Sequence, residues 1–235
     1  MNRCISYNIQ SMFNKLALLK HMGYTPDTIM DIGSYHGVWT NSARQIFGDE
    51  CQYYLFEAIN YQELNQFHDV SNITVFNVIL NDKMDEIDWF QMKNTGDSMF
   101  REKTHYFDNC DIIRRNTIDL NTLIQEQDHQ FLKLKNASNI LIKIDCQGAE
   151  IPILKGASNI LEKADFIILE IPLFGQYNEG VPTFLEHIQF MNDIGFIPYD
   201  VLEPHYINGF NMQIDMMFIN KTHRFNEIIK TVLKG

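Results

Sequence analysis

The sequence predicts an α/β fold built on a mostly parallel sheet with helices on both faces. Runs rich in Ile, Val, Tyr and Phe alternate with segments of helical periodicity, which is typical of βαβ units. The last two strand-like runs, 196–202 and 212–220, have only a loop between them, so they should form an antiparallel hairpin. No linker or repeat divides the 235 residues, and residues 1–235 are therefore expected to form a single domain.

The expected elements follow in order along the chain. An N-terminal helix within residues 1–24 is indicated by apolar side chains at helical spacing, closed by Gly23. The remaining patterns predict strands at 28–32, 51–58, 73–80, 140–146 and 165–171, helices at 38–48, 60–67, 117–127, 149–161 and 181–195, and a helix or tail at 224–235.

Residues 83–118 interrupt this alternation. Two strand-like runs, 87–93 and 112–115, flank a polar stretch with little periodicity. Long irregular insertions in compact domains are often lids or binding loops, and simple elaboration is the alternative. We expect inserted strands here and a possible lid loop.

Composition excludes several partners. The net charge of −11 repels nucleic acid and anionic membranes and tolerates a cationic ligand. The four cysteines are far apart and form no metal or disulfide pattern, and no apolar stretch approaches the length of a membrane span. These features predict a cytoplasmic protein and leave its oligomeric state open.

The stretch "TIMDIGSYHGVW" places Asp31 at a strand end, followed by Gly33 and Gly37. Gly33 permits a tight turn, and Gly37 lets the next helix approach the sheet. The spacing is neither the dinucleotide fingerprint nor a phosphate loop. A ligand with a sulfonium or ammonium group would gain from Asp31, whereas a plain strand–turn–helix explains the motif equally well.

Polar residues also end the next two strands. Glu57, followed by Ala58, is suited to hold two ribose hydroxyls, although a solvated strand end is the alternative. Asn81 and Asp82 follow the third strand, where they are expected to reach the edge of a base.

The blocks "MDIGSYHG", "LFEA", "NVILND", "TIDL" and above all "LIKIDCQGAEIPILKGA" resemble the FkbM-type methyltransferases, over roughly residues 28–195. The resemblance implies a class I enzyme that uses S-adenosylmethionine (SAM) to methylate hydroxyls of sugars or small metabolites. It implies a Rossmann-like, doubly wound, seven-stranded sheet of order 3-2-1-4-5-7-6 with the last strand antiparallel. Two positions depart from the family pattern. Where this chain has Ala58, family members often have proline, and where it has Gln147, they often have glutamate.

The cofactor-binding residues expected from these patterns are Asp31, Gly33, Ser34, Tyr35, Gly37, Glu57, Ala58, Asn81 and Asp82. A small-molecule or glycan acceptor is the expected partner. Two other function classes stay open: a nicotinamide-dependent oxidoreductase, disfavoured by the missing third glycine, and a non-catalytic binding module.

Methyl transfer to an alcohol needs alignment and help in losing the proton. Asp145 and Glu170 end neighbouring strands, so they are the catalytic candidates, acting as a base or sharing a divalent cation such as magnesium. A hydrogen-bonded cap is the alternative for Glu170. Lys143 is expected to pair with Asp31 or Glu170. Histidines 36, 105 and 205 are interpreted as solvated loop residues, with His105 a distant alternative as base.

Overall fold

Seven strands form the main sheet, in the order β3-β2-β1-β7-β8-β10-β9. The computed structural model describes residues 11–173 and 178–234. The strands are β1 (Thr28–Ile32), β2 (Gln52–Glu57), β3 (Ile73–Asn77), β7 (Ile140–Ile144), β8 (Ala164–Pro172), β9 (Phe196–Ile207) and β10 (Phe210–Asn220). β10 runs antiparallel to both β8 and β9, and the other pairings are parallel. The predicted order, parallel sheet and terminal hairpin are confirmed.

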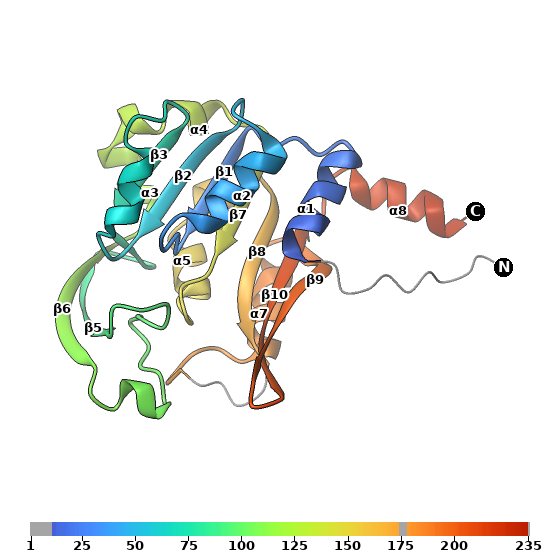
Figure 1. The fold of residues 1–235 in the computed structure, drawn as a ribbon. Coiled ribbons are helices and arrows are strands. Elements are labelled where there is room, and N and C mark those ends of the chain that lie inside the picture. The colour runs from blue at the N-terminus through green and yellow to red at the C-terminus, as the bar shows by residue number, and fades with distance from the viewer. Residues whose placement is uncertain (1–10, 174–177, 235) are drawn as a thin grey trace.

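Helices cover both faces of the sheet (Figure 1). Alternate residues of the central strands point to opposite faces, so that Ile29 joins one apolar core while Met30 and Ile32 join the other. The first core lies under α1 (Met12–His21), α2 (Val38–Phe47) and the start of α8 (Phe225–Lys234). The second lies under α3 (Leu120–Glu126), α4 (Leu132–Asn136), α5 (Glu150–Lys155), α6 (Ser158–Leu161) and α7 (Phe184–Asp193).

The inserted segment forms a second, three-stranded sheet of order β4-β6-β5. Its strands are β4 (Ile79–Leu80), β5 (Asp85–Gln91) and β6 (Asp111–Ile118). This sheet lies beyond the carboxyl ends of the main strands, on the same side as the turn between β9 and β10 (Figure 1). Two 3₁₀ turns, η2 (His105–Phe107) and η3 (Asp128–Gln130), complete the described elements together with η1 (Gln62–Phe67).

Several predicted boundaries were wrong for local reasons. The strand expected at 73–80 divides into β3 and β4, which belong to different sheets. The helix expected at 149–161 breaks at Gly156, where an added Cβ would lie 2.3 Å from the backbone oxygen of Asn81. The helix expected at 117–127 begins later, because Asp119 caps it by accepting a hydrogen bond from the Thr122 N–H. The helix expected at 60–67 is the 3₁₀ helix η1.

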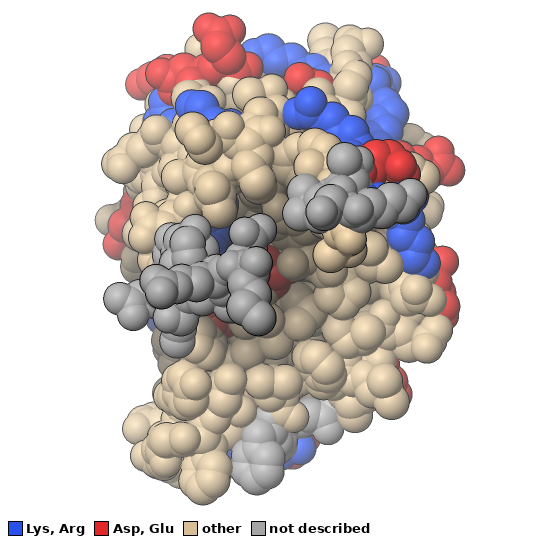
Figure 2. Space-filling view, turned by 90° about the vertical axis from the view of Figure 1, so that its right-hand side faces the viewer, with Lys and Arg blue, Asp and Glu red and all other residues tan. Residues whose placement is uncertain are grey.

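The face that carries α1 and α8 is unevenly charged (Figure 2). Charged side chains gather toward its upper part, and the lower part, toward the β9–β10 turn, is mostly uncharged (Figure 2). Within residues 11–173 and 178–234, no helix is both long and apolar enough to cross a membrane.

Candidate active site

The turn after β1 touches the end of β7, and this contact explains its first glycine. Gly33 has a φ of +79°, and a Cβ added there would lie 2.0 Å from the backbone oxygen of Asp145. Gly37 has a φ of +75°, and its Cβ would lie 2.3 Å from the ring of Phe67. Because neither position accepts a side chain, the turn can approach the end of β7 at Gly33, and the start of α2 can approach η1 at Gly37.

A first cavity lies at the carboxyl ends of β1, β2 and β7. It encloses about 720 Å³ including its open mouth, within the range of small-molecule sites. Five of the predicted site residues line it: Gly33, Tyr35, Glu57, Ala58 and Asp145. Apolar side chains of the second sheet, including Ile79, Leu80 and Trp89, close its other side.

Other predicted cofactor residues do not line this cavity. Ser34 is buried in the turn, and Gly37 is the N-cap residue that precedes α2. Asn81 and Asp82 follow β4 in the second sheet, because the chain leaves the main sheet at Asn77. Asp31 is 1% exposed and lies beneath the cavity floor.

Glu57 is held at the cavity wall by the backbone. Its Oε2 accepts a hydrogen bond from the Tyr35 N–H at 2.7 Å, and its Oε1 accepts one from the Ile59 N–H at 3.0 Å. Burial raises the pKa of Glu57 to about 7, although these two hydrogen bonds oppose the shift. At neutral pH the carboxyl group is therefore poised between its two protonation states.

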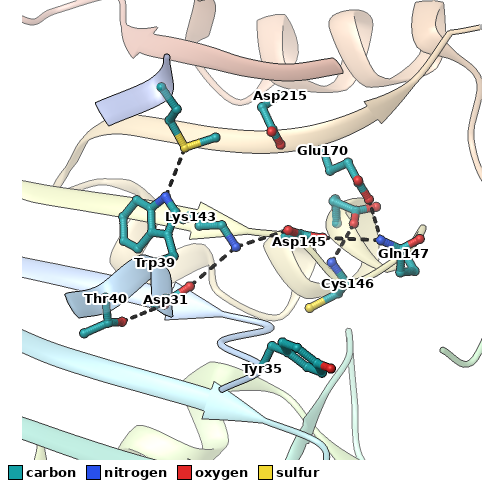
Figure 3. Close-up of polar contacts among 12 residues, drawn as sticks. Asp31, Tyr35, Trp39, Thr40, Lys143, Asp145, Cys146, Gln147, Glu170 and Asp215 are labelled. Atoms are coloured by element: carbon teal, nitrogen blue, oxygen red, sulfur yellow. Dashed lines mark hydrogen bonds and ion pairs between the residues drawn. The ribbon is translucent and has the colours of Figure 1, made fainter. Parts of the chain in front are cut away.

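A buried lysine joins two of the predicted acids (Figure 3). Lys143 Nζ lies 3.6 Å from Asp31 Oδ1 and 3.3 Å from Asp145 Oδ2, and it also lies over the ring of Trp39. The second oxygen of Asp31 accepts a hydrogen bond from Thr40 at 2.6 Å. Burial lowers the pKa of Lys143, but the carboxylates of Asp145 and Asp31 outweigh burial and hold that pKa above its ordinary value. The predicted pairing of Lys143 with Asp31 is confirmed.

A second cavity adjoins the first, between the main sheet and the inserted segment. It encloses about 1030 Å³ including its open mouth. Glu102, Tyr106, Glu170 and His205 line it, and Asp145 and Gln147, with Asn94 and Thr95, line both cavities. Asp145 and Gln147 therefore mark the place where the two cavities meet.

Gln147 connects the two predicted catalytic acids (Figure 3). Its Nε2 donates to Glu170 Oε2 at 2.7 Å and lies 3.4 Å from Asp145 Oδ1. Gln213 also donates to Glu170, at 3.2 Å. Burial and then the charge of Asp145 raise the pKa of Glu170 well above its ordinary value.

The expected cation site receives no support from the arrangement of ligands. Among the described residues, no group of three or more His, Cys, Asp or Glu side chains is placed to hold a metal ion. Asp145 and Glu170 instead share the amide of Gln147.

The loop between β5 and β6 covers both cavities. The carboxylate of Asp97 accepts hydrogen bonds from the N–H groups of Met92, Lys93 and Asn94, which fixes the start of the loop. Ser98 donates to the backbone oxygen of Gln147, so the loop is tied to the segment that follows β7. The segment "FGQYNEG" (174–180) follows the strand expected at 165–171, which makes it a further candidate for an acceptor pocket, and it falls partly on residues 174–177, outside the described residues.

His205 is not a solvated loop residue, and the prediction from the sequence is wrong here. It lies in β9, and its Nε2 is 2.8 Å from Oδ2 of Asp215 in β10. Asn208 and Gly209, both with positive φ, form the hairpin turn. An Asn-Gly pair between two strand-like runs is itself a hairpin signal. A turn placed at 208–209 would have extended the first expected strand of the hairpin beyond residue 202, so that it included His205. His105 lies in η2 and lines neither cavity.

The sheet order, with a glycine turn after the first strand and a cavity at the strand ends, defines a class I methyltransferase fold. The sequence model described as "Methyltransferase FkbM domain" matches residues 31–198. The chain belongs to the FkbM methyltransferase family, and it is a SAM-dependent methyltransferase. No match was found among curated protein sequences.

Solved structures with a similar fold include methyltransferases of different specificity. The Burkholderia thailandensis 1,6-didemethyltoxoflavin-N1-methyltransferase is 9% identical, with a TM-score of 0.48 and coverage of 89% of this chain and 78% of that one. The Synechocystis magnesium protoporphyrin IX methyltransferase is 10% identical, with a TM-score of 0.47 and coverage of 89% and 77%. A SAM-dependent methyltransferase from Aquifex aeolicus is 13% identical, with a TM-score of 0.42 and coverage of 87% and 88%. At these values the likenesses carry no argument about the substrate.

Proposed function

We propose that this chain is an O-methyltransferase that binds SAM in the first cavity and a hydroxyl acceptor, such as a sugar or small metabolite, in the second. The observation that carries the proposal is the pair of adjoining cavities, which share Asp145 and Gln147. In-line transfer requires the acceptor oxygen and the sulfonium methyl to meet, and the shared wall is where ligands of the two cavities would come into contact.

Glu57 is the proposed ribose ligand. Each of its carboxylate oxygens accepts one backbone hydrogen bond and keeps a lone pair for a ribose hydroxyl. Tyr35 and Tyr61, whose ring centroids are 5.0 Å apart, offer aromatic contacts beside it. The apolar wall formed by Ile79, Leu80 and Trp89 is suited to the adenine.

The second cavity favours an acceptor without negative charge. Glu102, Asp145 and Glu170 are among its lining residues, and neither Lys nor Arg is found among the described residues that line it. Carboxyl groups and the amides of Gln147 and Gln213 are good partners for hydroxyls, whereas a phosphate or carboxylate would meet like charges without a counter-ion. Neutral or cationic hydroxyl compounds are therefore the proposed acceptors.

Asp145 is proposed to orient the acceptor hydroxyl. Lys143 and Gln147 fix its carboxylate from two sides, which leaves it able to accept a hydrogen bond from the acceptor. The acceptor oxygen then bonds to the methyl carbon and its proton passes to a base or to water, while the carbon–sulfur bond breaks and its electron pair stays on sulfur as S-adenosylhomocysteine forms.

The test combines binding with methyl transfer. Calorimetry is expected to show SAM binding in the micromolar range, and Glu57→Ala should weaken it by about 1.5–3 kcal/mol because charge-assisted hydrogen bonds are lost. Transfer of a labelled methyl group to a panel of neutral sugars, amino sugars and sugar phosphates then tests the acceptor class. Preferred binding of NAD, or transfer only to amines or carbons, would contradict the proposal.

A second variant separates alignment from cofactor binding. Asp145→Asn keeps the shape and removes the charge, so kcat should fall by about 10²-fold with SAM affinity unchanged. Treatment with EDTA followed by magnesium separates a cation route, which would stop and recover, from a route carried by side chains alone. Unchanged turnover in Asp145→Asn would remove this residue from the reaction.

A further inference from the structure

We infer that His205 accepts the proton of the acceptor hydroxyl and that Asp215 positions its imidazole. The inference rests on the proposed O-methyl transfer and adds a base that comes from the antiparallel hairpin at the end of the sheet. It stands on the geometry of the His205–Asp215 pair in the wall of the second cavity.

The hairpin fixes which nitrogen is free. Asp215 is 5% exposed and its Oδ2 lies 2.8 Å from His205 Nε2, so the neutral imidazole carries its hydrogen on Nε2. The lone pair is then on Nδ1, to which none of the described residues donates a hydrogen bond. The His205 side chain is 39% exposed and lines the second cavity, so an acceptor can reach it.

The other acids of the second cavity are less suited to this task. Asp145 already faces Lys143 at 3.3 Å, and Glu170 Oε2 accepts hydrogen bonds from the amides of Gln147 and Gln213. Glu102 accepts a hydrogen bond from Thr104. None of the described residues that line this cavity donates a hydrogen bond to His205 Nδ1, so this basic atom is available to an acceptor hydroxyl.

The surroundings favour the protonated product of the step. The hydrogen bond that the His205 ring donates to Asp215 raises the pKa of His205, burial lowers it, and the charges of Asp215, Glu203 and Asp145 raise it further, with a net rise. Two further charged or titratable groups lie nearby. Glu170 of β8 is opposite Asp215 of β10, and the Lys143 ammonium is 3.3 Å from the Asp145 carboxylate. A carboxylate at Nε2 both sets the tautomer and stabilises the imidazolium that forms.

The step balances without a further reactant. The acceptor O–H bond breaks as its proton moves to Nδ1, and the oxygen bonds to the methyl carbon. The carbon–sulfur bond breaks with its electron pair left on sulfur, which neutralises the sulfonium. The imidazolium later returns its proton to water.

The first experiment compares His205→Gln and His205→Ala with His68→Ala. His68 also pairs with an aspartate, Asp69 at 3.2 Å, but it is exposed and lines neither cavity, so its loss should leave activity unchanged. Both His205 variants are expected to lose about 10²–10⁴-fold in kcat with SAM affinity unchanged by calorimetry. Added imidazole should partly restore His205→Ala. A loss below about threefold, or weaker SAM binding in place of slower turnover, would overturn the inference.

The second experiment measures the effect of Asp215 on the pKa of His205. NMR titration of the His205 ring should give a pKa above about 6.5, and Asp215→Asn should lower that pKa and shift the rising limb of the kcat–pH profile to lower pH. An unshifted limb in Asp215→Asn would overturn the positioning role. If the wild-type protein binds SAM and methylates no hydroxyl compound, the proposed function fails; if it methylates one and the His205 variants do so equally well, only this inference fails.

Discussion

The free protein should bind SAM more tightly as the pH rises from about 6 to about 8, because Glu57 must be ionised to hold the ribose. Its pKa is about 7 in the free protein. The ionised fraction is therefore roughly one-eleventh at pH 6 and ten-elevenths at pH 8. Since only the carboxylate accepts two hydroxyl donors, the dissociation constant should be about tenfold larger at pH 6, or about 1.4 kcal/mol.

Isothermal calorimetry measures this linkage. Repeating the titration near pH 7 in buffers of different ionisation enthalpy should reveal release of about half a proton per SAM bound. Glu57→Gln keeps the shape of the side chain and cannot titrate, so its weaker affinity should be flat over the same range. Affinity that is constant in the wild type, or that changes equally in Glu57→Gln, would refute the reasoning.

Three further predictions concern the framework of the site. Gly33→Ala forces a Cβ against the backbone oxygen of Asp145, so urea unfolding should show a loss of more than about 2 kcal/mol in the free energy of unfolding. The control Gly48→Ala, with a similar φ of +87° but open space around it, should lose about 1 kcal/mol. Equal losses would contradict the close approach at Gly33. Lys143→Met leaves Asp31 buried without its counter-charge and should lower the free energy of unfolding by about 3–5 kcal/mol. The control Lys230→Met breaks the exposed ion pair with Glu227 and should lower it by less than about 1 kcal/mol. A similarly small loss for Lys143→Met would show that the buried pair matters little. Amides of residues 94–109 should become more protected from hydrogen exchange when SAM and acceptor bind, and full protection in the free protein would disprove the lid.

The main features of the sheet could be predicted because they depend on local patterns. Apolar strands alternating with helices fix a parallel sheet, and the short gap before 212–220 fixes the terminal hairpin. Gly33 and Glu57 could be found because each follows directly from a strand end. The break between β3 and β4 inside the expected strand 73–80 could not be predicted, because both halves are apolar and only their pairing with different sheets separates them.

The polar network of the site depends on contacts that no local pattern contains. Asp31 lies near the end of a strand, where a cofactor-binding residue is expected, but its side chain contacts Thr40 and Lys143 below the cavity. Asp215 and His205 meet as diagonal neighbours across β9 and β10, because Gln213 lies opposite His205 and Asp215 lies opposite Glu203. Gln147 connects Asp145 with Glu170 through a backbone turn with a φ of +52°, which glutamine rarely adopts.

The most direct test of the proposed O-methyl transfer is to follow a labelled SAM methyl group in the presence of a neutral polyhydroxy acceptor and to identify the methylated atom of the product by NMR. The expected product is a methyl ether on a hydroxyl oxygen, formed with release of one S-adenosylhomocysteine per methyl group, and formed about 10²-fold more slowly by Asp145→Asn. A product methylated on nitrogen or carbon, or a methyl ether formed at the wild-type rate by Asp145→Asn, would contradict it.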